Sequence, residues 1–107
     1  MDVIYAVTTF SKHKHCLPNG EEGYPYTDTV GWFPTVEKAI EAVERNDADI
    51  ACLGMEIYAV IEQVPWGFYP IQVKEIAWYR WDEVESTYVQ CVRPNDYVGE
   101  HVAHFFG

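Results

Sequence analysis

One segment of the chain has the pattern of an amphipathic helix, while every other strongly patterned segment reads as a β-strand. Four apolar residues recur at the helical spacing i, i+3, i+4 and i+7, namely Val36, Ala39, Ile40 and Val43. Thr35 precedes them and belongs to the residue types that cap helix N-termini, and Glu37 lies in the first turn, where the helix dipole favours an acidic side chain. We therefore predict one principal helix over residues 35–45.

Five other segments are rich in β-branched, aromatic and other apolar residues. They predict strands over 3–9, 27–33, 57–64, 71–81 and 86–92. The first and third are apolar on both faces, so we expect them in the centre of the sheet. The order β-β-α-β-β-β does not alternate helices with strands, which disfavours a parallel doubly wound sheet. The expected fold is α+β, a mainly antiparallel five-stranded sheet with the helix on one face.

The length of 107 residues is that of a single domain, which we assign to 1–107. Residues 10–26 break every periodicity and contain the turn signal Pro18-Asn19-Gly20, so we predict a long loop there. Loops of that length in a compact domain are often functional. Residues 94–107 read as a polar turn followed by a C-terminal tail with apolar residues that can dock on the domain.

The formal net charge of −10 bears on the classes of partner. An acidic surface repels phosphate backbones and anionic lipid headgroups, so we expect neither direct nucleic-acid binding nor membrane binding. A protein partner stays open. The three cysteines are not closely spaced and predict no disulfide framework, and no signal peptide or apolar membrane span is evident. These features favour the cytoplasm.

Three stretches of the sequence resemble a known group of proteins. They are Tyr5 to Val7, Gly31 to Val43 and Tyr58 to Pro65, and they cover about a third of the chain. They resemble short uncharacterised proteins carried by prophages and mobile elements of Gram-positive bacteria. The resemblance implies a bacterial cytoplasmic protein of this architecture and brings no catalytic residues with it.

Aromatic residues supply the candidates for a binding surface. Trp66, Phe68 and Tyr69 fall in a predicted loop, and Trp78 and Trp81 lie in the strand that follows. Adjacent strand residues point to opposite faces, so a sheet covered on one side leaves either Trp78 or Tyr79 exposed. Aromatic residues are enriched at protein interfaces. The alternative is that these rings form the core and cover the second face of the sheet.

A second group of residues has the chemistry of metal ligands. His13, His15 and Cys16 lie close together, and His101 and His104 in the tail would complete a site if the tail folds back. None of the usual zinc-ligand spacings is present, so zinc is the weaker alternative, and we expect no cofactor. The histidines and the neighbouring lysines also suit a solvated loop.

No arrangement of residues predicts catalysis. The Cys16 thiol has no orienting group for a Cys–His pair, the carboxylates show no selective spacing, and the glycines form no phosphate loop. We therefore expect a small acidic protein-interaction module without enzymatic activity, which binds a protein partner or its own copy. The alternatives are metal binding and an acidic nucleic-acid mimic that occupies a basic partner.

Overall fold

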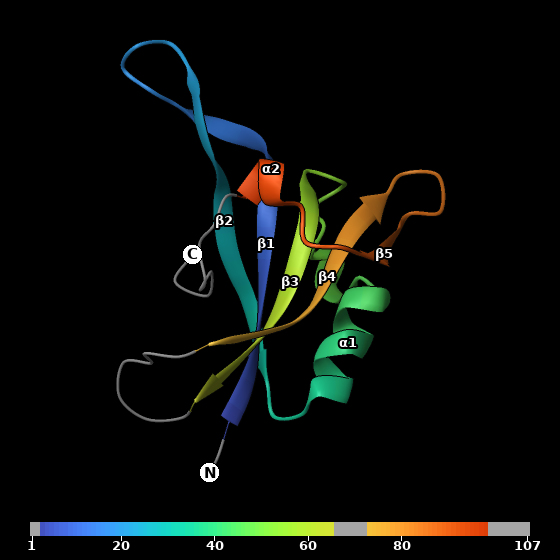
Figure 1. The fold of residues 1–107 in the computed structure, drawn as a ribbon. Helices are drawn as coiled ribbons and strands as arrows, with labels where there is room; N and C mark the ends of the chain where they lie inside the picture. The colour runs from blue at the N-terminus through green and yellow to red at the C-terminus, as the bar shows by residue number, and fades with distance from the viewer. Residues whose placement is uncertain (1–2, 66–72, 99–107) are drawn as a thin grey trace.

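The computed structural model describes residues 3–65 and 73–98, which form one sheet and two α-helices (Figure 1). The strands are β1 (Val3–Cys16), β2 (Glu22–Phe33), β3 (Glu56–Pro65), β4 (Lys74–Asp82) and β5 (Thr87–Cys91). The helices are α1 (Val36–Glu44), a short 3-10 turn η1 (Asp47–Asp49) and α2 (Asn95–Val98).

The sheet has the strand order β2-β1-β3-β4-β5, and each neighbouring pair is antiparallel. This confirms the predicted α+β fold with one principal helix. It also confirms that the first and third strands are central. Because β2 and β5 lie at the two ends of this order, they are the edges of the described sheet, and β2 is much the longer of the two.

Helix α1 forms as its sequence predicts. The Thr35 side chain accepts a hydrogen bond from the Lys38 backbone N–H at 3.2 Å, which caps the helix, and Glu41 pairs with Arg45 at 2.6 Å. The apolar stripe packs on the first face of the sheet. The buried residues of this core are Val7, Ala39, Val43, Ala51, Ala59, Ile61, Tyr79 and Tyr88.

The predicted loop over 10–26 is wrong. Residues up to Cys16 continue β1, and β2 begins at Glu22, so the two strands form a long hairpin that projects beyond the rest of the sheet (Figure 1). Gly20, with φ of +85°, lies in the tight turn between them. Gly23 and Pro25 led to the wrong prediction because both residue types are rare inside strands. Pro25 is tolerated in β2 because β2 is an edge of the described sheet, where a missing backbone N–H breaks no strand pairing.

Helix α2 covers part of the second face of the sheet, which the sequence did not predict. Val98 of α2 packs with Phe10, Val60 and Trp78, all of which are buried. The Tyr97 hydroxyl donates a hydrogen bond to the backbone carbonyl of Ser11, which fixes α2 over the end of β1. Part of the predicted 94–107 tail is therefore a docked helix, and the remainder lies outside the described residues.

Candidate functional site at the edge strand

Strand β2 combines strand-forming residues with exposed rings. It contains three tyrosine or tryptophan residues, together with the β-branched Thr27, Thr29 and Val30. The Tyr24, Tyr26 and Trp32 side chains are 59%, 50% and 49% exposed. On one side β2 pairs with β1, and no described strand pairs with its other side. An edge of this length offers unpaired backbone groups to another chain.

The exposed rings of β2 lie on both faces of the sheet. Asp28 pairs with Thr9, whereas Trp32 pairs with Ala6, and Thr9 and Ala6 point to opposite faces of β1. The change of face occurs at Val30, where a bulge shifts the register between the two strands. Tyr26 is two residues from Asp28 and shares its face. A strand added to this edge would therefore meet a tyrosine on one face and a tryptophan on the other.

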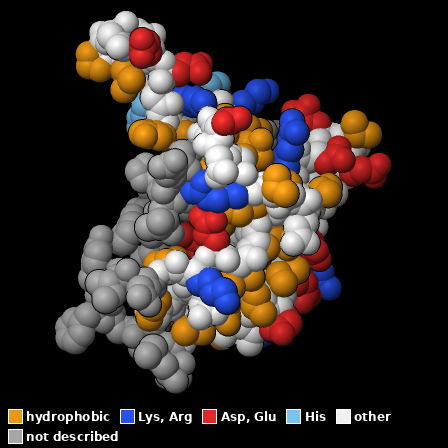
Figure 2. Space-filling model, in the orientation of Figure 1, with side chains coloured by type: hydrophobic (Ala, Val, Ile, Leu, Met, Phe, Trp, Pro, Cys, Tyr) orange, Lys and Arg blue, Asp and Glu red, His pale blue; other side chains and the backbone are white. Residues whose placement is uncertain are grey.

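Acidic side chains accompany these rings. β2 contains Glu22 and Asp28 and no lysine or arginine, and Glu21 precedes it in the turn. In Figure 2 the projecting hairpin carries apolar and acidic side chains, with lysine and histidine side chains toward its base, and the β1 arm contributes Lys12 and Lys14. Burial raises the pKa of the Glu56 carboxyl, and the negative charge of Asp28 raises that pKa further. The Glu56 Oε2 atom is buried and accepts no hydrogen bond from the described residues.

Trp78 does not belong to an exposed surface, contrary to its candidacy as an interaction residue. It is only 5% exposed, its ring centroid lies 5.2 Å from that of Phe10, and its Nε1–H donates to Glu75 at 2.9 Å. The neighbouring Tyr79 is 2% exposed on the opposite face. The prediction that one of the two rings is exposed was wrong because it assumed a sheet covered on one side.

The other predicted aromatic residues contribute little to a described surface. Trp81 is half-buried, and its ring meets the edge of the Tyr88 ring at 5.1 Å, so it extends the core under α1. Trp66, Phe68 and Tyr69 lie outside the described residues. The interaction prediction for these three stays a prediction.

The proposed metal ligands do not converge in the described structure. His13, His15 and Cys16 are exposed near the end of the hairpin, and the His15 ring packs on Tyr26 with a centroid distance of 3.9 Å. Within a strand, Cys16 points away from the face shared by the two histidines. Residues 3–65 and 73–98 contain no group of three metal-ligating side chains. His101 and His104 lie outside those ranges.

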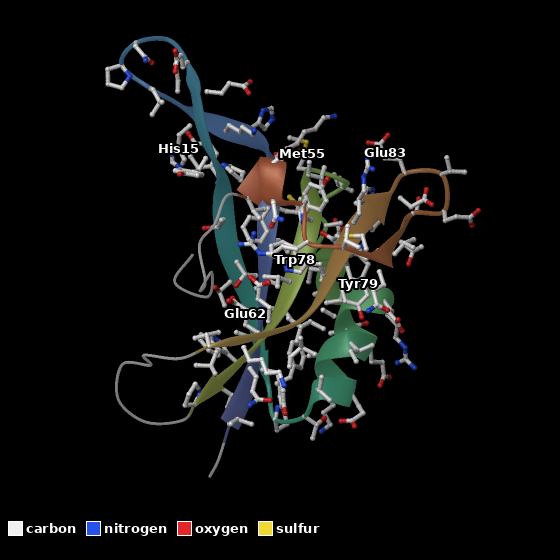
Figure 3. All side chains as sticks on the ribbon, viewed as in Figure 1. His15, Met55, Glu62, Trp78, Tyr79 and Glu83 are labelled. Carbon is white, nitrogen blue, oxygen red and sulfur yellow. The ribbon has the colours of Figure 1, made fainter. Side chains whose placement is uncertain are left out.

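Two carboxylates lie side by side on the face that α2 covers. Glu62 of β3 pairs directly with Glu75 of β4, and Glu62 is fully buried. Both Glu75 oxygens lie 3.2 Å from the Arg93 Nε–H, which donates to them. Figure 3 shows Glu62 and Trp78 on the body of the sheet, well away from His15 on the hairpin. Because Arg93 supplies a positive charge to Glu75, this cluster fits a structural role that connects β4 to the segment before α2.

Two shallow grooves meet at Arg80 and Cys91 beside β5. One has a volume of about 490 Å³ and is also lined by Tyr58 and Tyr97, and the other has a volume of about 680 Å³. Burial raises the pKa of the Cys91 thiol although Arg80 acts in the opposite direction, so this thiol is not activated as a nucleophile. The larger groove is lined by both acidic and basic side chains and selects no charge of ligand.

The sequence contains a signal for Tyr24, Tyr26 and Trp32 as residues of one strand. These rings recur at even-numbered positions across β2, which is the period of a strand. Gly23, Pro25 and the bulge at Val30 interrupted that period. The exposed rings of β2 are therefore candidate binding residues that sequence reasoning missed.

Comparison of this chain with models of protein families, with curated proteins and with solved structures finds no match. Among the described residues, no helix has both the length and the apolar character needed to cross a lipid bilayer.

Proposed function

We propose that this protein is a protein-interaction module that binds its partner through β2 and has no enzymatic role. One observation carries the proposal, namely an edge strand of twelve residues with Tyr24, Tyr26 and Trp32 exposed along it. Aromatic side chains supply much of the binding energy of protein interfaces, and an edge strand adds backbone hydrogen bonds. The resemblance to prophage proteins makes an accessory role in a bacterial cytoplasm part of the same proposal.

Site-specific crosslinking tests whether β2 is the binding surface. A photoreactive phenylalanine derivative replaces Tyr26 in one variant and Val84 in a control, because Val84 is 91% exposed in the turn between β4 and β5. We expect a defined adduct in the producing cell from position 26 and none from position 84. Mass spectrometry identifies the adduct and shows whether the partner is another protein or a second copy.

A second substitution separates binding from mere proximity. Trp32→Ala, placed in the position-26 crosslinking variant, removes a ring from the opposite face of the same edge. We expect the yield of the adduct to fall at least about tenfold, as for loss of an aromatic residue central to an interface. Equal adducts from positions 26 and 84, or an adduct at position 26 that Trp32→Ala leaves unchanged, would contradict the proposal.

A further inference from the structure

We infer that the chain bound by β2 is a basic, extended segment of another protein that adds to the sheet as a sixth strand, with a lysine or arginine opposite Asp28. This inference rests on the proposed function and specifies the chemistry of the partner. Three features of the described residues support it: the backbone of the edge, the placement of its rings and the sign of its charges.

The backbone of β2 is suited to strand addition. A strand bonded on one side only presents every second N–H and C=O group outward. Proteins commonly protect such edges with lysine, and β2 has none. Pro25 and the bulge at Val30 interrupt the edge locally. The stretch from Tyr26 to Thr29 lies between these interruptions and keeps a regular register over Thr27 to Thr29 with β1.

The rings of β2 hold an added strand from both faces. Side chains of the incoming strand alternate between the two faces of the sheet. On one face they meet Tyr26, whose ring is itself supported by His15, and on the other they meet Trp32. Rings on a single face would fit a globular surface resting on the sheet equally well, so their presence on both faces favours a strand.

The charges of the edge select a cationic partner. Asp28 is exposed at the middle of β2, on the same face as Tyr26, and Glu56 lies close enough for the Asp28 charge to act on it. The buried Glu56 Oε2 atom has no hydrogen-bond donor among the described residues. A lysine or arginine opposite Asp28 would supply positive charge to the Asp28 carboxylate, which is two strands away from Glu56 in the order β2-β1-β3. A cross-strand pair of opposite charges stabilises a sheet, and a like-charged pair destabilises it.

The same charges disfavour a second copy of this chain as the occupant. Antiparallel addition of β2 to another β2 would bring together two strands that each carry acidic residues and no basic ones. Each whole chain also has a formal net charge of −10. Long-range repulsion slows such an encounter, whereas attraction to a basic segment accelerates it.

Titration of the isotopically labelled protein with three synthetic peptides tests the inference. The first is a seven-residue strand of alternating valine and lysine with blocked ends. The second has glutamate in place of lysine. The third is the lysine peptide with alternate backbone nitrogens methylated, so that one edge cannot donate hydrogen bonds. NMR amide shifts report where each peptide binds. We expect the lysine peptide alone to shift residues of β2, and its affinity to fall with added salt.

Charge-reversal variants assign the selectivity to one residue. Asp28→Lys should weaken binding of the lysine peptide about fivefold or more, as expected for replacing an attractive pair by a repulsive one. Glu83→Lys makes the same change of charge at an exposed position in the β4–β5 turn, and we expect it to have less than half of that effect. Equal effects of the two variants would show general attraction to an acidic protein and would overturn the assignment to Asp28.

The outcomes distinguish this inference from the proposed function. Equal binding of the lysine and glutamate peptides, or undiminished binding of the methylated peptide, overturns the basic strand. So does the absence of binding by all three peptides. If position 26 still crosslinks a partner in any of these cases, β2 remains a binding surface for a different class of occupant. If position 26 crosslinks nothing, the proposed function itself fails.

Discussion

At the scale of single residues, the environment of each side chain decides its role more than its type does. Trp32 and Trp78 are both tryptophans in strands, yet one is half exposed on an edge and the other is enclosed between Phe10 and α2. The difference comes from the strand order, because among the described strands β2 has one neighbour and β4 has two. Residue type alone therefore could not rank the aromatic side chains as binding candidates.

Glu56→Gln should stabilise the protein at neutral pH. Burial and Asp28 raise the pKa of the folded carboxyl, so the folded protein binds this proton more tightly than the unfolded chain does. The stabilisation that this tighter proton binding gives the folded protein is fully present when the pH is below the pKa of Glu56 in the unfolded chain. It is lost as the pH rises through the pKa of Glu56 in the folded protein. We expect a gain of about half a kcal/mol at pH 7, after allowance for solvent screening, and almost none near pH 3. Thermal melts across this pH range measure it.

A lower melting temperature of Glu56→Gln at pH 7 would contradict this account of the carboxyl. Glu83→Gln is the matched control, because Glu83 is exposed in the β4–β5 turn. We expect that variant to melt within about 1 °C of the parent protein at both pH values, since isolated surface charges contribute little to stability.

Gly54→Ala and Gly20→Ala form a matched pair that isolates one close contact. Both glycines have positive φ, +86° and +85°, so alanine costs about 1 kcal/mol of stability at either site. A Cβ atom at Gly54 would also lie 3.1 Å from Trp81 Nε1, whereas at Gly20 it meets nothing within 4 Å. Chemical denaturation should show the larger loss for Gly54→Ala. Equal losses of stability in the two variants would mean that the Trp81 ring moves away from the added Cβ atom without destabilising the protein.

At the scale of secondary-structure elements, the helix and the central strands were predictable, whereas the interruptions in the strands were not. The stripe over Val36 to Val43 and the cap at Thr35 are local signals, and α1 forms where they place it. The bulge at Val30 and the shift between Ile61 and Glu62 depend on neighbouring strands. The second shift brings Glu75 to the face of Trp78, whereas side chains three residues apart in a regular strand point to opposite faces.

Val98→Ala tests whether α2 is part of the core or an optional cover. Val98 is 2% exposed and packs with Phe10, Val60 and Trp78, so truncation leaves a cavity under the helix. We expect a loss of about 2 kcal/mol in the free energy of unfolding, measured by chemical denaturation. Val92→Ala is the control, because Val92 is 85% exposed in the segment that leads to α2. Equal losses of unfolding free energy from the two variants would mean that packing of α2 on the sheet does not contribute to the core.

At the scale of the whole molecule, α1 packs on one face of the described sheet and α2 covers part of the other, while the edge strand β2 carries exposed rings. The sequence predicted a helix on one face of the sheet and an aromatic binding surface on the uncovered face or at an edge. The packing of α2 with Trp78 removes that ring from the candidates on the face, and the edge alternative stays open. The composition showed a high content of acidic and aromatic residues, and β2 contributes Glu22, Asp28 and the exposed Tyr24, Tyr26 and Trp32. Composition alone could not show which aromatic side chains are exposed, because exposure depends on the strand order.

Hydrogen exchange of the backbone amides, measured for the protein alone and with its crosslinked partner, tests the central role of β2 most directly. An added strand protects the outward amides of β2 between Tyr26 and Thr29, before the bulge at Val30, and leaves those of β5 unchanged. We predict at least about a tenfold slowing of exchange confined to β2, as for amides that gain a backbone hydrogen bond. Slowing at β5 or around α2, with β2 exchanging as before, would contradict the account.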